Sequence, residues 1–235
     1  MKMVAVITAR GGSKRIPRKN IKDFLGQPIM AYSIKAALDS GLFGEVMVST
    51  EDAEIAEVAR KYGAAVPFLR SAATADDYAT TFDVLHEVVT EYDKRGTRFD
   101  WLCCLYPTAP FVTPGALRAG AEKLLQSGAD CLTPVVKFSF PPQRAFVLDE
   151  AGYLVYKWPE YKNSRSQDLQ PFYHDAGQFY FYKSEYFFAK EPFPKAIPFL
   201  LDDLLVQDID NVEDWALAEM KYRLLRESHP ELLRR

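Results

Sequence analysis

Cysteine is scarce in this sequence, with three residues in a chain of 235. Cys103 and Cys104 are neighbours and Cys131 stands alone, so no CxxC spacing is present. This excludes a disulfide framework and a zinc site built from cysteine pairs. Because Cys103 and Cys104 lie within an apolar run, we expect both to be buried thiols.

The sequence also lacks a long hydrophobic run and an excess of charge of either sign. The opening run from Met3 to Ala9 is too short to span a membrane and meets Arg10 at once, which favours a buried strand over a signal peptide. The formal net charge of -3 gives no reason to expect nucleic acid or an anionic membrane as a partner. We therefore expect a cytoplasmic protein.

Short apolar runs alternate with helical patterns along most of the chain. The predicted strands are 4–8, 45–50, 64–68, 100–106, 131–136 and 178–182. The predicted helices are 28–41, a second ending near residue 62, 80–94, 114–126 and a last one beginning after residue 211. Ser49 with Asp52 is predicted to cap the second helix, and Asn211 with Asp214 the last. This alternation indicates an α/β fold with a Rossmann-like, mostly parallel sheet flanked by helices.

Residues 137–175 interrupt the alternation with proline, aromatic and polar residues and little helical periodicity. Within them, 148–154 has the pattern of a hairpin. We interpret 137–175 as an inserted irregular arm in one α/β domain made of residues 1–136 and 176–235. The arm is a candidate for covering the functional site or for contacting a second subunit.

A basic loop with two glycines follows the first predicted strand. It reads Ala9-Arg10-Gly11-Gly12-Ser13-Lys14-Arg15-Ile16-Pro17-Arg18-Lys19-Asn20. The glycines allow a tight turn that presents N–H groups to an anion, and the cations can neutralise a triphosphate. The Walker A spacing is absent. A solvated basic turn is the alternative, but ligands of open α/β sheets bind beyond the carboxyl ends of strands, which favours phosphate binding.

Two further groups of polar residues lie late in the chain. In Asp208-Ile209-Asp210 the two carboxylates alternate on an extended segment and can face one point, as in a Mg²⁺ site. Taken alone, Asp210 could simply precede the last helix as part of its cap. Around Gly177, His174 and Gln178 can hydrogen-bond a polyhydroxylated substrate, although ordinary strand-entry polarity is the alternative.

With these motifs identified, the chain resembles the CMP-sialate synthetase family over nearly its whole length. The resemblance implies a nucleotide-diphospho-sugar transferase type of fold, CTP as a substrate and a homodimer joined through the arm. It assigns to the nucleotide pocket Arg10, Gly11, Gly12, Ser13, Lys14, Lys19, Asn20, Arg70, Thr80 and Thr81. Asp77 lies between Arg70 and Thr80 in the sequence and belongs to the same matching segment. It assigns the Mg²⁺ to Asp208 and Asp210, and catalysis to these two with Arg10 and Lys14.

The chain departs from most sialate enzymes on the acceptor side. Tyr106-Pro107-Thr108-Ala109-Pro110 stands where a Gln-Pro-Thr-Ser-Pro stretch is usual, and Ala176-Gly177-Gln178 replaces Asn-Gly-Ala. These differences resemble the pseudaminic acid cytidylyltransferase branch. The candidate sugar-binding residues are Tyr106, Lys137, Arg165, His174 and Gln178, with Lys137 or Arg165 as the partner of the sugar carboxylate.

The resemblance implies that the anomeric hydroxyl of a nine-carbon sugar acid, a nonulosonic acid, attacks the α-phosphorus of CTP and releases pyrophosphate. The sequence identifies no general base. Pseudaminic acid is the expected acceptor, with N-acetylneuraminate or an octulosonate as alternatives. A glycosyltransferase with a DxD metal site and a non-catalytic nucleotide-binding protein are the rival classes. In glycosyltransferases the DxD more often lies mid-chain, and a mere binder needs no metal pair.

Overall fold

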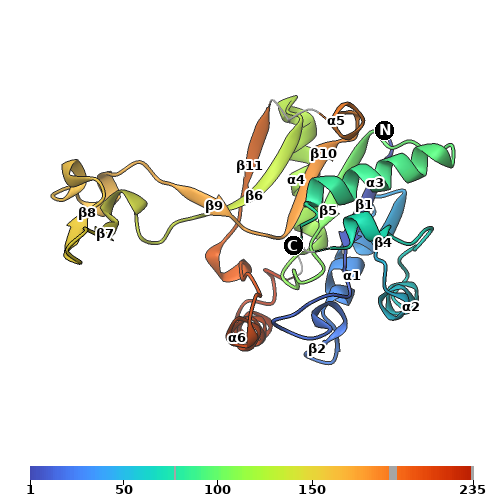
Figure 1. Cartoon of the computed structure of the whole chain (residues 1–235), viewed down its shortest axis with the longest axis horizontal. Helices are drawn as coiled ribbons and strands as arrows, with labels where there is room; N and C mark the ends of the chain where they lie inside the picture. The colour runs from blue at the N-terminus through green and yellow to red at the C-terminus, as the bar shows by residue number, and fades with distance from the viewer. Residues whose placement is uncertain (77, 191–194, 234–235) are drawn as a thin grey trace.

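A single sheet forms the centre of the protein, as seen in a computed structural model that describes residues 1–76, 78–190 and 195–233 (Figure 1). Its strands lie in the order β11-β6-β10-β5-β1-β4, and β9 pairs additionally with β6. The strands are β1 (Met3–Thr8), β4 (Glu45–Ser49), β5 (Trp101–Leu105), β6 (Cys131–Lys137), β9 (Tyr173–Asp175), β10 (Phe179–Lys183) and β11 (Ala196–Leu200). All run in one direction except β9 and β10, which confirms the mostly parallel sheet.

Successive side chains of each strand point to opposite faces of the sheet, and this divides the core into two layers. On β1, Ala5 and Ile7 pack with helices α1 (Met30–Ser40), α2 (Ala53–Lys61) and α4 (Pro114–Ser127). Val4 and Val6 point to the opposite face and pack with α3 (Thr81–Lys94) and α5 (Glu185–Ala189). The sheet is therefore covered on both faces, as expected for a parallel sheet.

A third cluster joins the two ends of the chain. Helix α6 (Val212–Ser228) packs through Trp215, Ala218 and Leu225 against Ile16 and against a small ribbon formed by β2 (Asp23–Phe24) and β3 (Gln27–Pro28). No helix in the described ranges combines the length and apolar character needed to cross a membrane.

Most of the predicted helix ends are confirmed. Thr113 caps α4 with Pro114 in its first turn, and Asn211 forms a capping box with Asp214 at α6. The capping box predicted from Ser49 is wrong, because Asp52 itself caps α2 while the Ser49 hydroxyl accepts a hydrogen bond from Arg70.

The strand predicted at 64–68 is also wrong. Only an isolated bridge between Met47 and Ala65 forms there. Pro67, which has no N–H group, cannot extend that pairing.

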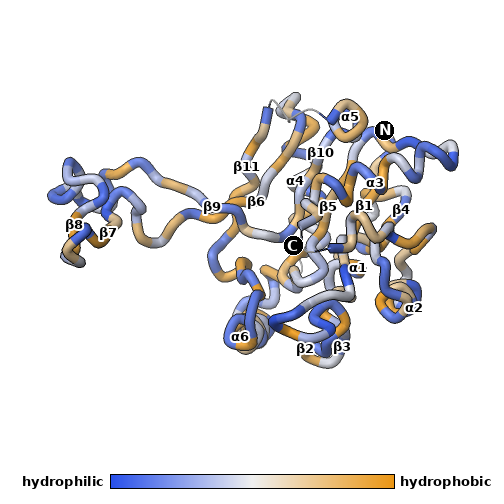
Figure 2. Tube along the Cα trace, in the orientation of Figure 1, coloured by the Kyte–Doolittle hydropathy of each residue, from blue (hydrophilic) through white to orange (hydrophobic). Residues whose placement is uncertain are grey.

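The arm projects away from the sheet (Figure 1). Lys137 on β6, where the arm begins, pairs with Tyr173 on β9, close to where the arm ends. The predicted hairpin is confirmed as β7 (Phe146–Leu148) paired with β8 (Leu154–Tyr156). Apolar residues colour part of this hairpin orange although it is remote from the core (Figure 2).

Candidate active site

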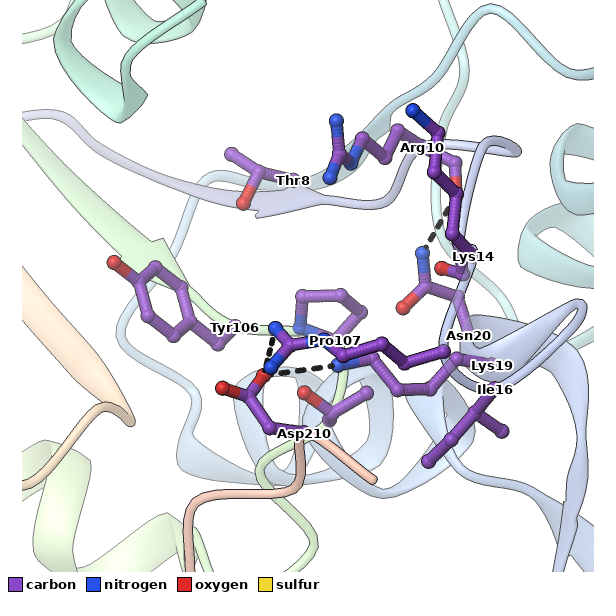
Figure 3. A pocket seen from close by; sticks show the side chains of 12 residues that line it. Thr8, Arg10, Lys14, Ile16, Lys19, Asn20, Tyr106, Pro107 and Asp210 are labelled. Atoms are coloured by element: carbon purple, nitrogen blue, oxygen red, sulfur yellow. Dashed lines mark hydrogen bonds and ion pairs between the residues drawn. The ribbon is translucent and has the colours of Figure 1, made fainter. Parts of the chain in front are cut away.

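A cavity of about 350 Å³ lies beyond the carboxyl ends of β1 and β5 (Figure 3). It is lined by Thr8, Arg10, Ser13, Lys14, Arg15, Ile16, Lys19, Asn20, Tyr106, Pro107, Thr108 and Asp210. The loop after β1, the segment after β5 and the segment before α6 thus meet at one place. The strand order accounts for the first two, because β1 and β5 are neighbouring parallel strands.

The basic loop is folded back on itself by a buried amide. Asn20, which is 4% exposed, donates from Nδ2 to the Arg10 carbonyl over 2.8 Å. The Ala9 N–H bonds the Ser49 carbonyl at the end of β4 over 3.1 Å, which ties the start of the loop to the sheet. Asn20 was predicted to complete the nucleotide pocket, and it both lines the cavity and fixes the shape of the loop.

Acidic residues after β4 hold the two ends of the loop. The Gly11 N–H donates to Glu51 Oε1 over 2.6 Å, so the prediction that Gly11 offers this group to a ligand is not met. A Cβ on Gly11 would lie 2.6 Å from an Asp52 oxygen, which explains why glycine is needed. Arg18, with φ of 55°, donates to both oxygens of Asp52. Gly12 is exposed and does not line the cavity.

The segment 208–210 is placed by its central residue. Ile209 is 1% exposed and packs in the same cluster as Ile16 of the basic loop. The Asp210 N–H donates to Asp214 of the α6 capping box over 3.0 Å, and Lys19 Nζ donates to the Ile209 carbonyl over 2.6 Å. Burial of Ile209 therefore leaves the two flanking aspartates on the polar side of the segment.

The loop cations and the late aspartates interact directly. The Arg15 guanidinium lies 2.8 Å from Asp210 Oδ1, and Lys19 Nζ lies 3.9 Å from the same oxygen. Burial lowers the pKa of Lys19, while the carboxylates of Asp210 and Asp208 act in the opposite direction. Both aspartates are thus close enough to Lys19 to act on its charge. Asp208 is exposed, and only Asp210 lines the cavity.

A second cavity of about 190 Å³ shares Thr8 and Arg10 with the first. Arg70 and Thr81 line it, as the resemblance implied. Arg70 is buried and donates to the Ser49 hydroxyl over 3.1 Å and to the Ser49 carbonyl over 2.6 Å. Burial lowers the pKa of Arg70.

Thr80, which was predicted beside Thr81 in the nucleotide pocket, does not line either cavity. Its hydroxyl forms the capping box of α3 with Asp83. Asp77 lies outside the described residues.

The predicted sugar-binding residues separate into three places. Tyr106 lines the main cavity. Gln178 is 3% exposed, does not line the cavity and donates from Nε2 to the Leu205 carbonyl. Lys137, Arg165 and His174 are exposed and belong to the arm, where Arg165 pairs with Asp168. In one chain, therefore, the arm residues do not join the cavity that holds Tyr106.

Sequence reasoning did not assign several cavity residues to the site. Arg15 was part of the basic stretch but was given no role, and Thr8, Pro107 and Thr108 were not singled out. Position alone could have found three of these residues, because Thr8 ends β1, and Pro107 and Thr108 follow β5 at the same edge of the sheet.

The residues present fit a magnesium ion shared with a substrate. Within the described part of the chain, no three His, Cys, Asp or Glu side chains gather closely enough to enclose a metal. Mg²⁺ needs no such cage, because one or two carboxylates hold it together with waters and substrate phosphates. Asp208 and Asp210 supply oxygen donors of this kind beside a cationic loop.

Comparison with known proteins agrees with this geometry. The sequence profile of the family described as "Cytidylyltransferase" matches residues 4–224. The pseudaminic acid cytidylyltransferase of Campylobacter jejuni is 43% identical over 97% of this chain and 99% of its own length. The CMP-N,N'-diacetyllegionaminic acid synthase of Legionella pneumophila is 35% identical over 97% of this chain and 99% of its own.

The fold is found in a solved structure as well. CMP:2-keto-3-deoxy-manno-octonic acid synthetase, solved in complex with CTP, matches with a TM-score of 0.68 and 18% identity, over 97% of this chain and all of that one. A mostly parallel sheet with the fold of this solved structure, a cationic loop after β1 and a near full-length profile match therefore agree. This chain is a member of the cytidylyltransferase family of enzymes.

Proposed function

We propose that this protein transfers CMP from CTP to the anomeric hydroxyl of pseudaminic acid and releases pyrophosphate, in the cytoplasm, where CTP is available. The observation that carries the proposal is the meeting of the basic loop with Asp210 around one cavity, with Arg15 at 2.8 Å from its carboxylate. A nucleoside triphosphate and a divalent ion need this combination of cations and carboxylates in one place. The choice of acceptor follows the relatives named above.

In this proposal some cavity residues neutralise the charge of the phosphates, and others hold the reacting groups in position. Arg10 and Lys14 neutralise the β- and γ-phosphates as pyrophosphate leaves, and Ser13 donates a hydrogen bond to a phosphate oxygen. Lys19 holds the Ile209 carbonyl and so keeps the two aspartates beside the loop. Asp208 and Asp210 would hold Mg²⁺, which would supply charge neutralisation for the phosphates of CTP. The sugar hydroxyl is then aligned with the α-phosphorus by the cavity walls at Tyr106 and Thr108.

Arg15 and Lys19 now pair with the carboxylate that this proposal gives to the ion. A divalent ion would compete with these two cations for Asp210, and the phosphates of CTP would offer the cations another anionic partner. Binding of CTP with Mg²⁺ would therefore turn Arg15 toward the phosphates, while Lys19 keeps its hydrogen bond to the Ile209 carbonyl. Direct phosphate contact by Arg15 is part of the proposal.

The protein acts as a homodimer in this proposal. Lys137, Arg165 and His174 lie on the arm, are exposed and do not line the cavity of their own chain. The arm hairpin exposes apolar residues such as Leu148 and Leu154. An arm that covers the neighbouring subunit would bring Lys137 or Arg165 to the sugar carboxylate and bury the hairpin. Each site would then contain residues of both subunits.

A panel of acceptors tests the activity. Purified protein is incubated with CTP, MgCl₂ and one of pseudaminic acid, N,N'-diacetyllegionaminic acid, N-acetylneuraminate or 2-keto-3-deoxy-manno-octonate, and pyrophosphate is measured. We expect the highest kcat/KM with pseudaminic acid and no turnover after chelation of Mg²⁺ with EDTA. Preference for another acceptor would reassign the substrate, and absence of pyrophosphate with every sugar acid would refute nucleotidyl transfer.

A further inference from the structure

Helix α3 holds the loop that follows Arg70 through a single carboxylate. Glu87 Oε1 accepts the Ser71 N–H over 2.7 Å, and Oε2 accepts the Ser71 hydroxyl over 2.9 Å and the Thr74 hydroxyl. Ser71 precedes and Thr74 ends a 3₁₀ turn (Ala72–Thr74), and the Ser71 side chain bonds Glu87 instead of capping that turn. Both carboxylate oxygens of Glu87 therefore fix this turn.

The carboxylate of Glu87 stands on a rigid support. Leu85 and Val88, on either side of Glu87 in α3, are each 1% exposed and pack in one core layer with Val4 and Val6 of β1. A helix packed on the sheet holds its polar groups more precisely than a loop does. Glu87 itself is half-buried and lines neither the main cavity nor the second cavity. It can therefore act on a ligand in either cavity only through the loop that it holds.

The other end of this loop reaches Arg10 and the second cavity. Asp76 folds the chain back, because its carboxylate accepts the N–H groups of Tyr78 and Ala79 over 2.9 and 2.7 Å. The Asp76 carbonyl accepts a hydrogen bond from Arg10 Nη1 over 3.1 Å. Asp76 and Ala79 line the second cavity, as does Arg10. The turn described above thus ends two residues before the carbonyl that binds Arg10.

Arg10 borders both cavities, so the direction of its side chain matters to each of them. An arginine side chain has several rotatable bonds, and fixing it when a ligand binds costs conformational entropy. A carbonyl that already bonds the guanidinium reduces this cost, because the group is held in place before the ligand arrives. The stability of the loop around Asp76 therefore bears on how tightly Arg10 can bind an anion.

We propose that Glu87 is a positioning residue for CTP binding: it fixes the turn 72–74 and with it the Asp76 carbonyl that orients Arg10. This rests on the proposed function, which places Arg10 on the phosphates of CTP. It adds a residue outside both cavities to those on which nucleotide affinity depends. Loss of the Glu87 hydrogen bonds frees the loop, and the Arg10 side chain then loses its fixed direction.

Binding of CTP to Glu87 variants tests this role. Titration calorimetry with CTP in MgCl₂, without a sugar acid, gives Kd. We expect Glu87→Ala to raise Kd about ten-fold, the loss of roughly one good hydrogen bond. Glu87→Gln should stay within about two-fold of wild type, because its amide oxygen still accepts the Ser71 N–H and its amide nitrogen can donate to the hydroxyls. Glu91→Ala, one turn later on α3, is the matched control, because Glu91 bonds Lys94 and Arg95 at the end of the helix.

A double-mutant cycle shows whether Glu87 acts through Arg10. In an Arg10→Ala background, which itself binds CTP more weakly, Glu87→Ala should raise Kd no further. If Glu87→Ala melts well below wild type, Ser71→Ala replaces it in the cycle. This variant removes one of the three bonds at an exposed residue, and we expect it to raise Kd about three-fold.

Three results would overturn the inference. They are wild-type CTP affinity of the folded variant, an equal loss with and without Arg10, and a ten-fold loss in Glu87→Gln or Glu91→Ala. Pyrophosphate release by the wild type is measured separately. Its absence with every sugar acid refutes the proposed function, whereas the three results above concern CTP binding alone.

Discussion

Asp208 and Asp210 differ in their surroundings although they are two positions apart. Asp210 already pairs with Arg15 and Lys19, whereas Asp208 is exposed and acts on Lys19 through its charge. Removing the Asp208 charge should therefore leave the ion pairs of the loop intact and weaken only the binding of a metal ion by the two aspartates. This makes Asp208 the cleaner residue for testing the metal role.

We expect Asp208→Asn to lower kcat/KM at least 100-fold, since an amide is a poorer ligand than a carboxylate for a hard cation. The measurement is pyrophosphate release over a titration of MgCl₂. The loss should be partly recovered at high Mg²⁺, and the melting temperature should not change. Asp203→Asn, an exposed change five positions earlier, serves as the control. Wild-type activity of Asp208→Asn at limiting Mg²⁺ would exclude the assignment.

Gln178 shows how a residue can matter to a site without contacting substrate. Its amide holds the Leu205 carbonyl, in a short 3₁₀ turn (Asp203–Leu205) that leads to the aspartates. Gln178→Leu should lower the free energy of unfolding by about 1–3 kcal/mol, because it leaves that carbonyl without its partner. Activity should fall equally with every sugar acid, whereas exposed Gln126→Leu should have no effect. A changed preference among sugar acids would instead indicate direct contact.

At the scale of elements, the N-terminus of α2 joins the helix to the basic loop. Asp52 accepts the Ile55 N–H as the N-cap of α2, and it also binds Arg18 of the loop. The hydrogen bond from Arg18 lowers the pKa of Asp52 from 3.8 to about 2. One side chain thus stabilises the helix and fixes the loop that is expected to bind phosphate.

Two substitutions separate these roles. Asp52→Asn keeps a good N-cap and loses the charge, while Asp52→Ala loses both and should cost about 1 kcal/mol more in the free energy of unfolding. Because folding lowers the pKa of Asp52, its charge contributes stability above about pH 4, and this contribution is lost as pH falls toward 2. Urea unfolding of wild type and Asp52→Asn should therefore differ at pH 7 and converge near pH 2. If the difference in unfolding free energy between wild type and Asp52→Asn did not change with pH, the substitution would act through the N-cap interaction and not through the lost charge.

Elements that carry a local signal could be predicted from the sequence, and those that depend on distant partners could not. The strands 4–8 and 131–136 and the helix after Thr113 have apolar periodicity or capping residues of their own. Strand β11 was missed because Pro198 lies within it. Among the described strands it pairs only with β6, so it stands at the edge of the sheet, where proline is tolerated.

The candidate site divides in the same way. The basic loop and the Asp208–Asp210 motif could be recognised because their chemistry is contained in short segments. Two other contacts join residues that are distant in the chain. Arg15 pairs with Asp210, about 195 positions away, and the Gly11 N–H donates to Glu51, about 40 positions away. No short-range sequence pattern specifies such contacts.

At the scale of the whole molecule, the arm is the feature that the proposed homodimer would complete. A two-stranded hairpin is only marginally stable alone in water. Leu148, Tyr153 and Leu154 are 69%, 72% and 65% exposed at its end. Apolar side chains gathered on a projecting element mark an interaction surface, and a second copy of the chain provides a matching arm and a cavity to cover.

Charged residues at the hairpin should therefore separate the subunits. We expect wild type to sediment at twice 26.7 kDa and the double variant Leu148→Glu with Leu154→Glu to sediment as a monomer at micromolar concentration. Met220→Glu, equally exposed at 68% but on α6, should leave the mass unchanged. If the arm cations act on the neighbouring site, the monomer should retain CTP binding while KM for the sugar acid rises. A double variant that remains dimeric, or a wild-type monomer with full activity, would exclude the arm as the subunit contact.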